Sequence, residues 1–348
     1  MTQQTPRAAS AIDRIKPPVV AVLLSATMRQ RLLGAEAEAA LATLAEVRSP
    51  AGSGLAAAEL PDLLAGVTAC ITGWGTPPLT ESVLTENPQL GLIAHSAGSI
   101  RKLVPMPAVE RGPRVSHAAA IIADAVAEFV IAQLLLSVRP LHIVDREMKA
   151  GVDWHQIRER HLGRLLGART VGVVGAGYVG RTVIRLLTAF RCRILVFDPL
   201  LAADAAARLG VEQCSLPDLF AESDLVTLHA PVLPETRGMI DAGLLRSLRD
   251  GAIVVNTARA ALVDEGALLD ELRTGRIAAA LDVFDTEPLP ADSPFRGLPN
   301  VLLSPHAAGH STDTYLQQGQ AMVDEVRRYL GGEPLHFEVT PAMLATMA

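Results

Sequence analysis

Two histidines near the end of the sequence are candidates for chemistry. His306 and His310 stand four residues apart in the stretch SPHAAGH, residues 304–310. On one helix this spacing would place both rings on the same face, where two histidines can hold a metal ion. Pro305 and Gly309, however, predict that no continuous helix runs through the stretch, and no third ligand follows at a suitable spacing. We therefore expect no metal site, with His306 as a proton-transfer group and His310 outside the chemistry.

An arginine and a glutamate follow two other apolar runs. Arg259 comes after AIVVNT (252–257), and Glu287 precedes a proline after AALDVF (279–284). The planar fork of an arginine matches a carboxylate, and a carboxylate bonded to an imidazole favours the charged ring. Taken singly, Arg259 could form a structural ion pair and Glu287 a turn. Taken with His306 at a third strand end, they predict an active site for the reduction of a keto acid.

The stretch GAGYVG, residues 175–180, has the spacing of a dinucleotide-binding loop. It lies between an apolar run and a helical stretch, and Asp198 follows Gly180 by 18 residues. The first glycine permits a tight turn, the second lets a pyrophosphate approach the backbone, and the third allows close packing of helix and strand. Asp198 would accept hydrogen bonds from the ribose and repel a 2′-phosphate, which favours NAD over NADP. The structural alternative is a tight turn that binds nothing.

The strand ends that should face this loop complete the expected cofactor site. We predict that it comprises Gly175, Gly177, Tyr178, Val179, Gly180, Asp198, His229, Ala230, Pro231, Thr236, Thr257 and Ala258.

These residues need two parallel sheets to position them. Short apolar runs alternate with helical stretches twice along the chain, a pattern typical of doubly wound α/β domains. Helices are predicted at 29–47, 120–139 and 313–330, and residues 140–167 as a helix fragment and loop. The predicted strands are 18–24, 66–73, 90–95 and 112–117 in the first sheet, then 169–175, 193–198, 224–229, 252–257, 279–284 and 300–304 in the second.

Composition limits the class of protein. The 348 residues suggest about two domains, and 49% hydrophobic with 20% charged residues is typical of a globular chain. A net charge of -6 without a long basic run argues against a nucleic-acid partner. The three scattered cysteines argue against a disulfide framework and fit a reducing cytoplasm. The apolar stretch 129–138 is shorter than the roughly 20 residues that span a bilayer, so no membrane partner is expected.

Several motifs together resemble the D-isomer-specific 2-hydroxyacid dehydrogenases. The stretches are VGVVGAGYVG, LHAPVLPETRGMI, NTARAALVDEGAL, ALDVFDTEPLP and LSPHAAG, in that order across about 165–310. The resemblance implies that Arg259 holds the substrate carboxylate and polarises the keto oxygen. It implies that Glu287 pairs with His306, the general acid of reduction and base of oxidation. It also implies that Asp282 lies near the nicotinamide carboxamide.

The resemblance further implies an architecture. A Rossmann NAD-binding domain, residues 119–310, would be inserted in a flavodoxin-like substrate domain, residues 17–118 plus 311–348, with hinges near 117–124 and 307–311. In the substrate domain, the backbone amides of a loop that includes Ser96, Ala97 and Gly98 would meet the substrate carboxylate.

The same segment departs from the family pattern. The family loop often reads GxGxDxxD, whereas this chain has SAGSIRK. Arg101 and Lys102 either bind a second acidic group of the substrate or belong to a solvated face. Trp74 either lines the pocket or packs in the ordinary way, and Ala260 replaces the glycine usual after the family's arginine.

Other functions remain open on this scaffold. Relatives of the fold serve as NAD-sensing corepressors, and others oxidise formate or phosphite. Glu287 counts against formate, because formate dehydrogenases of this kind have a glutamine near the histidine. The long apolar helix at 120–139 predicts a homodimer, since its exposure would leave a large apolar patch. The small-molecule substrate expected of the first function is a 2-hydroxy or 2-keto acid.

Overall fold

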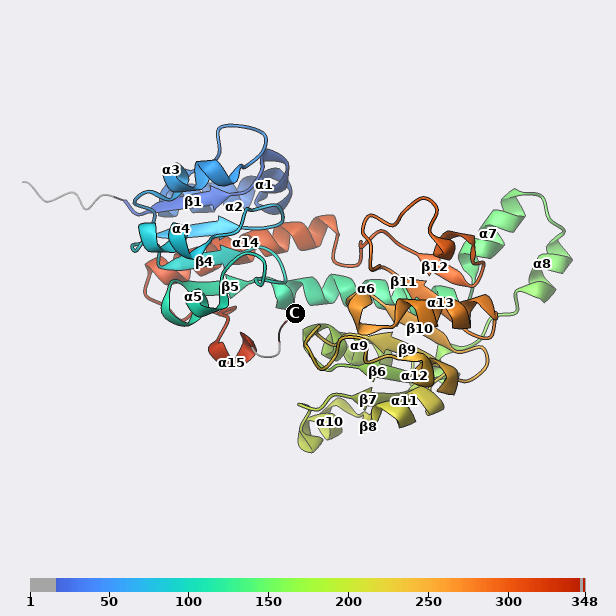
Figure 1. The fold of residues 1–348 in the computed structure, drawn as a ribbon. Coiled ribbons are helices and arrows are strands. Elements are labelled where there is room, and N and C mark those ends of the chain that lie inside the picture. Colours follow the sequence, from blue (N-terminus) through green and yellow to red (C-terminus); the bar gives the residue numbers. More distant parts are fainter. Residues whose placement is uncertain (1–16, 345–346, 348) are drawn as a thin grey trace, which may run out of the picture.

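The computed structural model describes residues 17–344 and 347, and it consists of two parallel α/β units joined by two long helices (Figure 1). Every strand pair within the two sheets is parallel. The predicted fold class is therefore confirmed. The exact boundaries of the two domains, at 118/119 and 310/311, remain a prediction.

The smaller unit is built on a five-stranded sheet in the order β2-β1-β3-β4-β5. This is the flavodoxin-like order of a doubly wound fold. One face packs against α1 (Ala26–Leu32), α2 (Gly34–Leu44) and α14 (Thr312–Leu330), and α3 (Leu60–Leu64) packs on the other. Shorter helices are α4 (Glu81–Glu86), α5 (Met106–Arg111) and α15 (Pro341–Leu344). The strands are β1 (Val19–Leu23), β2 (Glu46–Arg48), β3 (Ala69–Thr72), β4 (Leu92–His95) and β5 (Arg114–His117).

The larger unit has a seven-stranded sheet in the order β12-β11-β10-β9-β6-β7-β8. The order reverses between β6 and β9, and such a switch point is where open α/β sheets bind ligands. The strands are β6 (Thr170–Val174), β7 (Arg193–Phe197), β8 (Glu212–Gln213), β9 (Leu225–Leu228), β10 (Ile253–Asn256), β11 (Ala278–Leu281) and β12 (Val301–Leu303). The helices are α9 (Tyr178–Thr188), α10 (Ala203–Leu209), α11 (Leu216–Glu222), α12 (Ala242–Ser247) and α13 (Glu265–Arg273).

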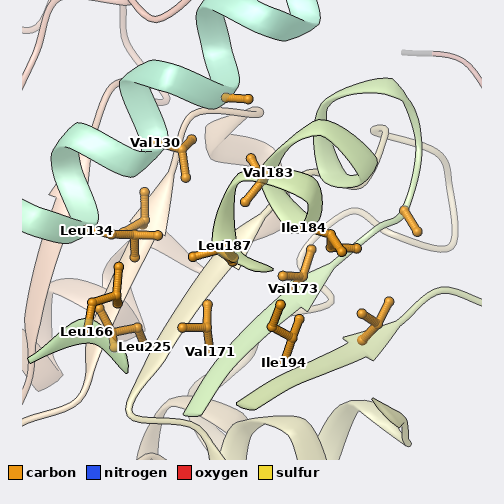
Figure 2. Close-up of a cluster of buried hydrophobic side chains, with 14 of the residues drawn as sticks. Val130, Leu134, Leu166, Val171, Val173, Val183, Ile184, Leu187, Ile194 and Leu225 are labelled. Atoms are coloured by element: carbon orange, nitrogen blue, oxygen red, sulfur yellow. The ribbon is translucent and has the colours of Figure 1, made fainter. Parts of the chain in front are cut away.

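The long helix α6 (Ala119–Val138) connects the two units. Figure 2 shows Val130 and Leu134 of α6 beside Val183 and Leu187 of α9, above Val171 of β6. By length and composition this 20-residue helix could cross a membrane. The sequence-based argument against a membrane span considered only residues 129–138 and therefore underestimated the length of the apolar helix. In the fold it packs against α9, α14, β10 and β11, as a connecting helix.

Three segments differ from the sequence-based prediction. The helix expected over 29–47 is two helices, because the chain turns at Gly34 with φ +57°. Its last residues form the edge strand β2 instead, paired with β1. The segment 140–167 contains two helices, α7 (Leu141–Lys149) and α8 (Trp154–Arg160), which project from the larger unit in Figure 1.

Candidate active site

His306 and Glu287 form an ion-pair contact at the carboxyl edge of the large sheet. Nδ1 of His306 lies 2.7 Å from Oε2 of Glu287, and the other oxygen of Glu287 accepts from the Phe284 amide at 3.0 Å. Because Nδ1 is engaged, Nε2 is the nitrogen of His306 that can exchange a proton with a substrate. His306 has φ +53°, an uncommon backbone conformation for a residue other than glycine, and such residues cluster at functional sites.

The surroundings keep Glu287 ionised. Partial burial raises the pKa of its carboxyl, but hydrogen bonds from His306 and the Phe284 amide and the positive charges of His306 and Arg259 outweigh this. The net result is a lowered pKa. A carboxylate that stays negative accepts from Nδ1 of His306 and holds the imidazole in one orientation.

Arg259 is fixed by the end of strand β10. The side chain of Asn256 donates to the Arg259 carbonyl at 3.0 Å and accepts from the Ala258 amide at 3.0 Å. Nη1 of Arg259 donates to the Ala258 carbonyl at 2.6 Å. Surrounding protein lowers the pKa of Arg259, and the charge of Glu287 opposes this. Asn256, which we did not single out from the sequence, therefore shapes the loop that carries the arginine.

Asp282 clamps the loop that carries His306. It is 1% exposed, and its carboxylate accepts from the Ser304 hydroxyl at 2.6 Å and from the amides of Ala307 and Ala308, each at 2.9 Å. The Asp282 carbonyl also accepts from the His306 amide at 2.9 Å. The structure thus gives Asp282 a positioning role, and its contact with a nicotinamide remains a prediction.

The three glycines of the GAGYVG loop differ in their surroundings. Gly175 has φ +95°, and a Cβ there would lie 2.8 Å from the Ala230 nitrogen. A Cβ on Gly180 would lie 2.0 Å from the Gly175 carbonyl oxygen. At Gly177 a Cβ would meet nothing within 4 Å, and α9 begins at the next residue. The loop therefore combines a tight turn, close packing and open space at the amino end of a helix.

Asp198 lies beside this loop at the end of β7. Its Oδ2 accepts from the Ala176 amide at 2.6 Å and its Oδ1 from the Leu200 amide at 2.8 Å. A carboxylate at this position can accept hydrogen bonds from the two ribose hydroxyls of an adenosine, and it repels the 2′-phosphate of NADP. The hydrogen bond between Ala176 and Asp198 joins the loop after β6 to the end of β7.

Comparisons with known proteins agree with this geometry. Residues 131–308 match the family described as D-isomer specific 2-hydroxyacid dehydrogenase, NAD binding domain. A glyoxylate reductase of Korarchaeum cryptofilum is 36% identical over 262 residues, 74% of this chain and 78% of that protein. The chain belongs to the D-isomer specific 2-hydroxyacid dehydrogenases.

Two further similarities extend this result. A D-3-phosphoglycerate dehydrogenase of Mycobacterium leprae is 36% identical over 252 residues, 72% of this chain, and the chain spans about half of that relative, 47%. The crystal structure of the TT0316 protein from Thermus thermophilus has a TM-score of 0.78 and 30% identity, covering 92% of this chain and all of that one. The dehydrogenase is thus an oxidoreductase with NAD as its cofactor.

The structure of the dehydrogenase fits NAD at the switch point. Thr257 follows β10, and its hydroxyl is buried without a hydrogen-bond partner in the described part of the chain. Such an orphaned group suits a ligand atom. His229 bonds Thr227 at 3.0 Å, and burial lowers the pKa of its ring to about 3, so it stays neutral. The Thr236 hydroxyl donates to the Pro231 carbonyl at 2.6 Å and shapes the neighbouring loop.

The expected substrate loop of the dehydrogenase lies at the end of β4. The Ser96 amide donates to the Thr72 carbonyl at 2.8 Å, so this amide is already used, while the Ser96 hydroxyl is buried without a partner among the described residues. Arg101 donates to the carbonyls of Met347 and Leu344, at 2.9 and 3.3 Å. Arg101 therefore anchors the C-terminal segment, and Lys102 remains on the exposed surface.

Trp74 belongs to an aromatic cluster that joins the two units of the dehydrogenase. Its ring centroid lies 5.7 Å from that of His310 and 5.6 Å from that of Tyr315. The Tyr315 hydroxyl lies 2.7 Å from Nδ1 of His310. His310 is thus tied to α14, while His306 is tied to Glu287. No group of three or more metal-ligating side chains occurs among the described residues.

Proposed function

We propose that the dehydrogenase interconverts 2-keto acids and D-2-hydroxy acids with NADH and NAD. The observation that carries this proposal is the 2.7 Å contact between Nδ1 of His306 and Oε2 of Glu287. The positive charge of Arg259 also acts to lower the pKa of Glu287. These three groups supply a proton donor, its orienting base and a carboxylate receptor.

The roles follow from the chemistry of each group. NADH, when bound, supplies the hydride for the carbonyl carbon. The guanidinium of Arg259 binds the substrate carboxylate and draws electron density toward the keto oxygen. Nε2 of His306 gives its proton to that oxygen, so the carbonyl becomes a hydroxyl. Glu287 stabilises the imidazolium that gives its proton in reduction, and the imidazolium that forms when Nε2 takes the hydroxyl proton in oxidation.

Both units are needed for this site. We propose closure of the substrate domain, 17–118 with 311–348, onto the cofactor domain, 119–310. The loop of Ser96, Ala97 and Gly98 then meets the carboxylate that Arg259 also binds. Contacts across the two units support this: the ring of His117 faces Tyr178, and that of Trp74 faces His310. Closure excludes water and strengthens each charge interaction at the reacting carbonyl.

An NADH-oxidation screen over 2-keto acids tests the proposal. We expect turnover of at least one keto acid, and we expect Arg259→Ala to reduce kcat/KM by about 10²–10³-fold. Arg273→Ala serves as a control, because the exposed Arg273 side chain pairs with Asp270 on its own helix, α13. Full activity of Arg259→Ala on every keto acid would contradict the mechanism, and oxidation of phosphite alone would favour the alternative.

We further propose a homodimer formed through α6 and the projecting helices α7 and α8. Large apolar side chains there face solvent in the single chain, an arrangement that marks an association surface. They are Leu135, Leu141, Met148, Trp154, Leu162 and Leu165. Light scattering is expected to give twice the chain mass of 36.8 kDa, and a lower mass for Trp154→Glu. A monomeric wild-type protein would disprove this.

A further inference from the structure

Two buried histidines lie beneath the substrate loop and have no part in the chemistry above. His95 ends β4 and His117 ends β5, they are partners in the sheet register, and each is 4% exposed. Burial lowers the pKa of both rings, that of His95 to about 4. The charge of His117 also lowers the pKa of His95, and a hydrogen bond with the Ser99 backbone opposes this. Both rings are therefore neutral near pH 7, and a buried neutral imidazole needs specific partners.

The partners of both rings lie in the substrate loop or the strand beside it. Nδ1 of His117 lies 2.9 Å from the Gly98 carbonyl oxygen, and since a carbonyl only accepts, Nδ1 carries the proton. Nδ1 of His95 lies 3.0 Å from the Thr72 hydroxyl, and the same ring bonds the Ser99 backbone. The histidines thus hold two successive residues of the loop.

Ala118, which lies in the predicted hinge 117–124, holds the rest of the loop. The Ala118 amide donates to the Ala97 carbonyl at 3.0 Å and to the His95 carbonyl at 3.1 Å. The carbonyls of Ala97 and Gly98 are therefore both turned toward the β5–α6 connection. Because each peptide group is planar and trans, the amides of Gly98 and Ser99 point the opposite way. His117 and Ala118 thus fix the direction in which the loop amides point, and we propose that these amides bind the substrate carboxylate.

His117 also reaches the cofactor domain. Its ring centroid lies 6.3 Å from that of Tyr178 at an interplanar angle of 64°, an edge-to-face contact. Tyr178 is the first residue of α9 and follows Gly177 of the glycine loop. One side chain therefore touches the substrate loop through a hydrogen bond and the cofactor loop through a ring contact, at the junction of the two units.

We propose that His117 is a positioning residue that sets the direction of the substrate-loop amides and joins this loop to the cofactor loop at Tyr178. The inference rests on the proposed reduction of 2-keto acids, because it assigns the loop to their carboxylate. His117 itself neither donates a proton to the substrate nor contacts it. Its effect is on the arrangement of the loop when the two units close.

Two substitutions separate the hydrogen bond from the ring. His117→Asn removes the ring but keeps an N–H donor bonded to Cγ, at the place of Nδ1 in histidine. His117→Phe keeps a ring but leaves the Gly98 carbonyl without its donor. With saturating NADH, we expect His117→Phe to raise the KM of the best keto acid about tenfold while kcat changes less. His117→Asn should stay within about threefold of wild type. Equal KM values for His117→Phe and wild type, or equal losses in both variants, would overturn the proposal.

Hydrogen–deuterium exchange reads the loop without any substrate. Peptides that cover residues 96–103 should exchange faster in His117→Phe than in wild type and in His117→Asn, because the loop has lost a fixed carbonyl. If no keto acid is turned over by wild type but this difference appears, the proposed function fails and the loop-positioning role stands. If turnover is normal and exchange is unchanged, the positioning role is disproved alone.

A double-substitution cycle tests the link to the cofactor loop, and it needs no His117→Phe protein, because it keeps the donor to the Gly98 carbonyl and removes only the ring contact. His117→Asn and Tyr178→Leu both remove the ring contact. We expect the KM increases of the two single variants not to add in the double variant, because contacting residues share one interaction. Additive increases would show that the two residues act separately and would remove Tyr178 from the proposal.

Discussion

The candidate site has two sides, which are fixed in different ways. The cofactor wall comprises the loops after β6, β7, β10, β11 and β12, and the substrate wall is the loop after β4, residues 96–99. On the cofactor wall, Glu287 bonds an amide three residues away and Asn256 bonds the loop of Arg259, while Glu287 and Asp282 hold the His306 loop across neighbouring strand ends. On the substrate side, the loop after β4 is held by side chains from β3, β4 and β5, namely Thr72, His95 and His117. The residues of the cofactor wall lie in contiguous sequence motifs, whereas no motif marks the two histidines that hold the substrate wall.

This difference also separates two uses of histidine. His306 is accessible to solvent and contacts the Glu287 carboxylate, an arrangement that suits the proton transfer proposed for it. His95 and His117 are buried and neutral, so they can only hold hydrogen bonds. If the comparison is right, substitutions on the cofactor wall change kcat most, while those on the substrate wall change KM, loop exchange and acid stability.

The largest effect is expected at His306. His306→Gln removes the proton donor, and kcat for keto-acid reduction should fall about 10²–10⁴-fold, the usual contribution of general acid–base catalysis. NADH affinity, measured by fluorescence, should change little because Asp198 and the glycine loop are untouched. A kcat near that of wild type would show that the proton comes from another group. The cofactor wall would then no longer differ from the substrate wall in its effect on kcat.

The next effect concerns the choice of cofactor. Asp198→Asn keeps one acceptor oxygen, which can serve the amide of either Ala176 or Leu200, and removes the negative charge. The ratio of kcat/KM for NADPH to that for NADH should rise by at least about tenfold, because a charge that repels the 2′-phosphate is gone. An unchanged ratio would mean that Asp198 only braces the glycine loop.

The sequence predicted where the glycine loop and the strand ends lie, and the reason is physical. The roles of Gly175 and Gly180 follow from backbone geometry within one turn, and the positions of Arg259, Glu287 and His306 follow from the ends of consecutive strands. The contact of His306 with Glu287 was expected, and the structure shows it at 2.7 Å. Local pattern was also sufficient for the parallel sheets, since apolar runs between turns are strong signals.

The substrate wall was not predictable in the same way. His95 and His117 had no pattern around them, because their partners are a carbonyl and a hydroxyl that the sequence does not place. Arg101 was left between two explanations, and its contact with the C-terminal segment depends on residues more than 240 positions away. The strand β2 was missed because its three residues continue a helical pattern, and only pairing with β1 decides its structure.

A third prediction concerns acid stability of the substrate wall. The pKa of His95 is lowered from its ordinary value near 6.5 to about 4, and that of His117 is lowered too. Between these values the unfolded chain binds protons that the folded chain does not, so stability is complete above about pH 6.5 and is lost as the pH falls toward 4. Each such histidine contributes a slope of up to about 1.4 kcal/mol per pH unit to the free energy of unfolding.

Urea unfolding between about pH 7 and 4.5 measures this slope. We expect a shallower slope for His95→Asn and for His117→Asn than for wild type, whatever their stability at neutral pH. His155→Asn, at an exposed position, is the matched control. Parallel curves for all four proteins would mean that the two rings do not resist protonation, and the contrast with His306 would disappear.

The smallest effect is expected at His310, which makes the sharpest test of the contrast because it lies four residues from His306. Its ring contacts Trp74 and Tyr315, and burial lowers its pKa while the charge of His306 acts in the same direction. The ring is therefore mainly neutral near pH 7, and it packs between Trp74 and Tyr315. His310→Phe should keep the ring contact with Trp74 and leave kcat within about threefold of wild type. His310→Ala should raise KM slightly more than it lowers kcat, because closure of the two units depends on that contact.

If both His310 variants lose kcat as much as His306→Gln does, proton transfer involves the pair, and the assignment of His306 alone is wrong.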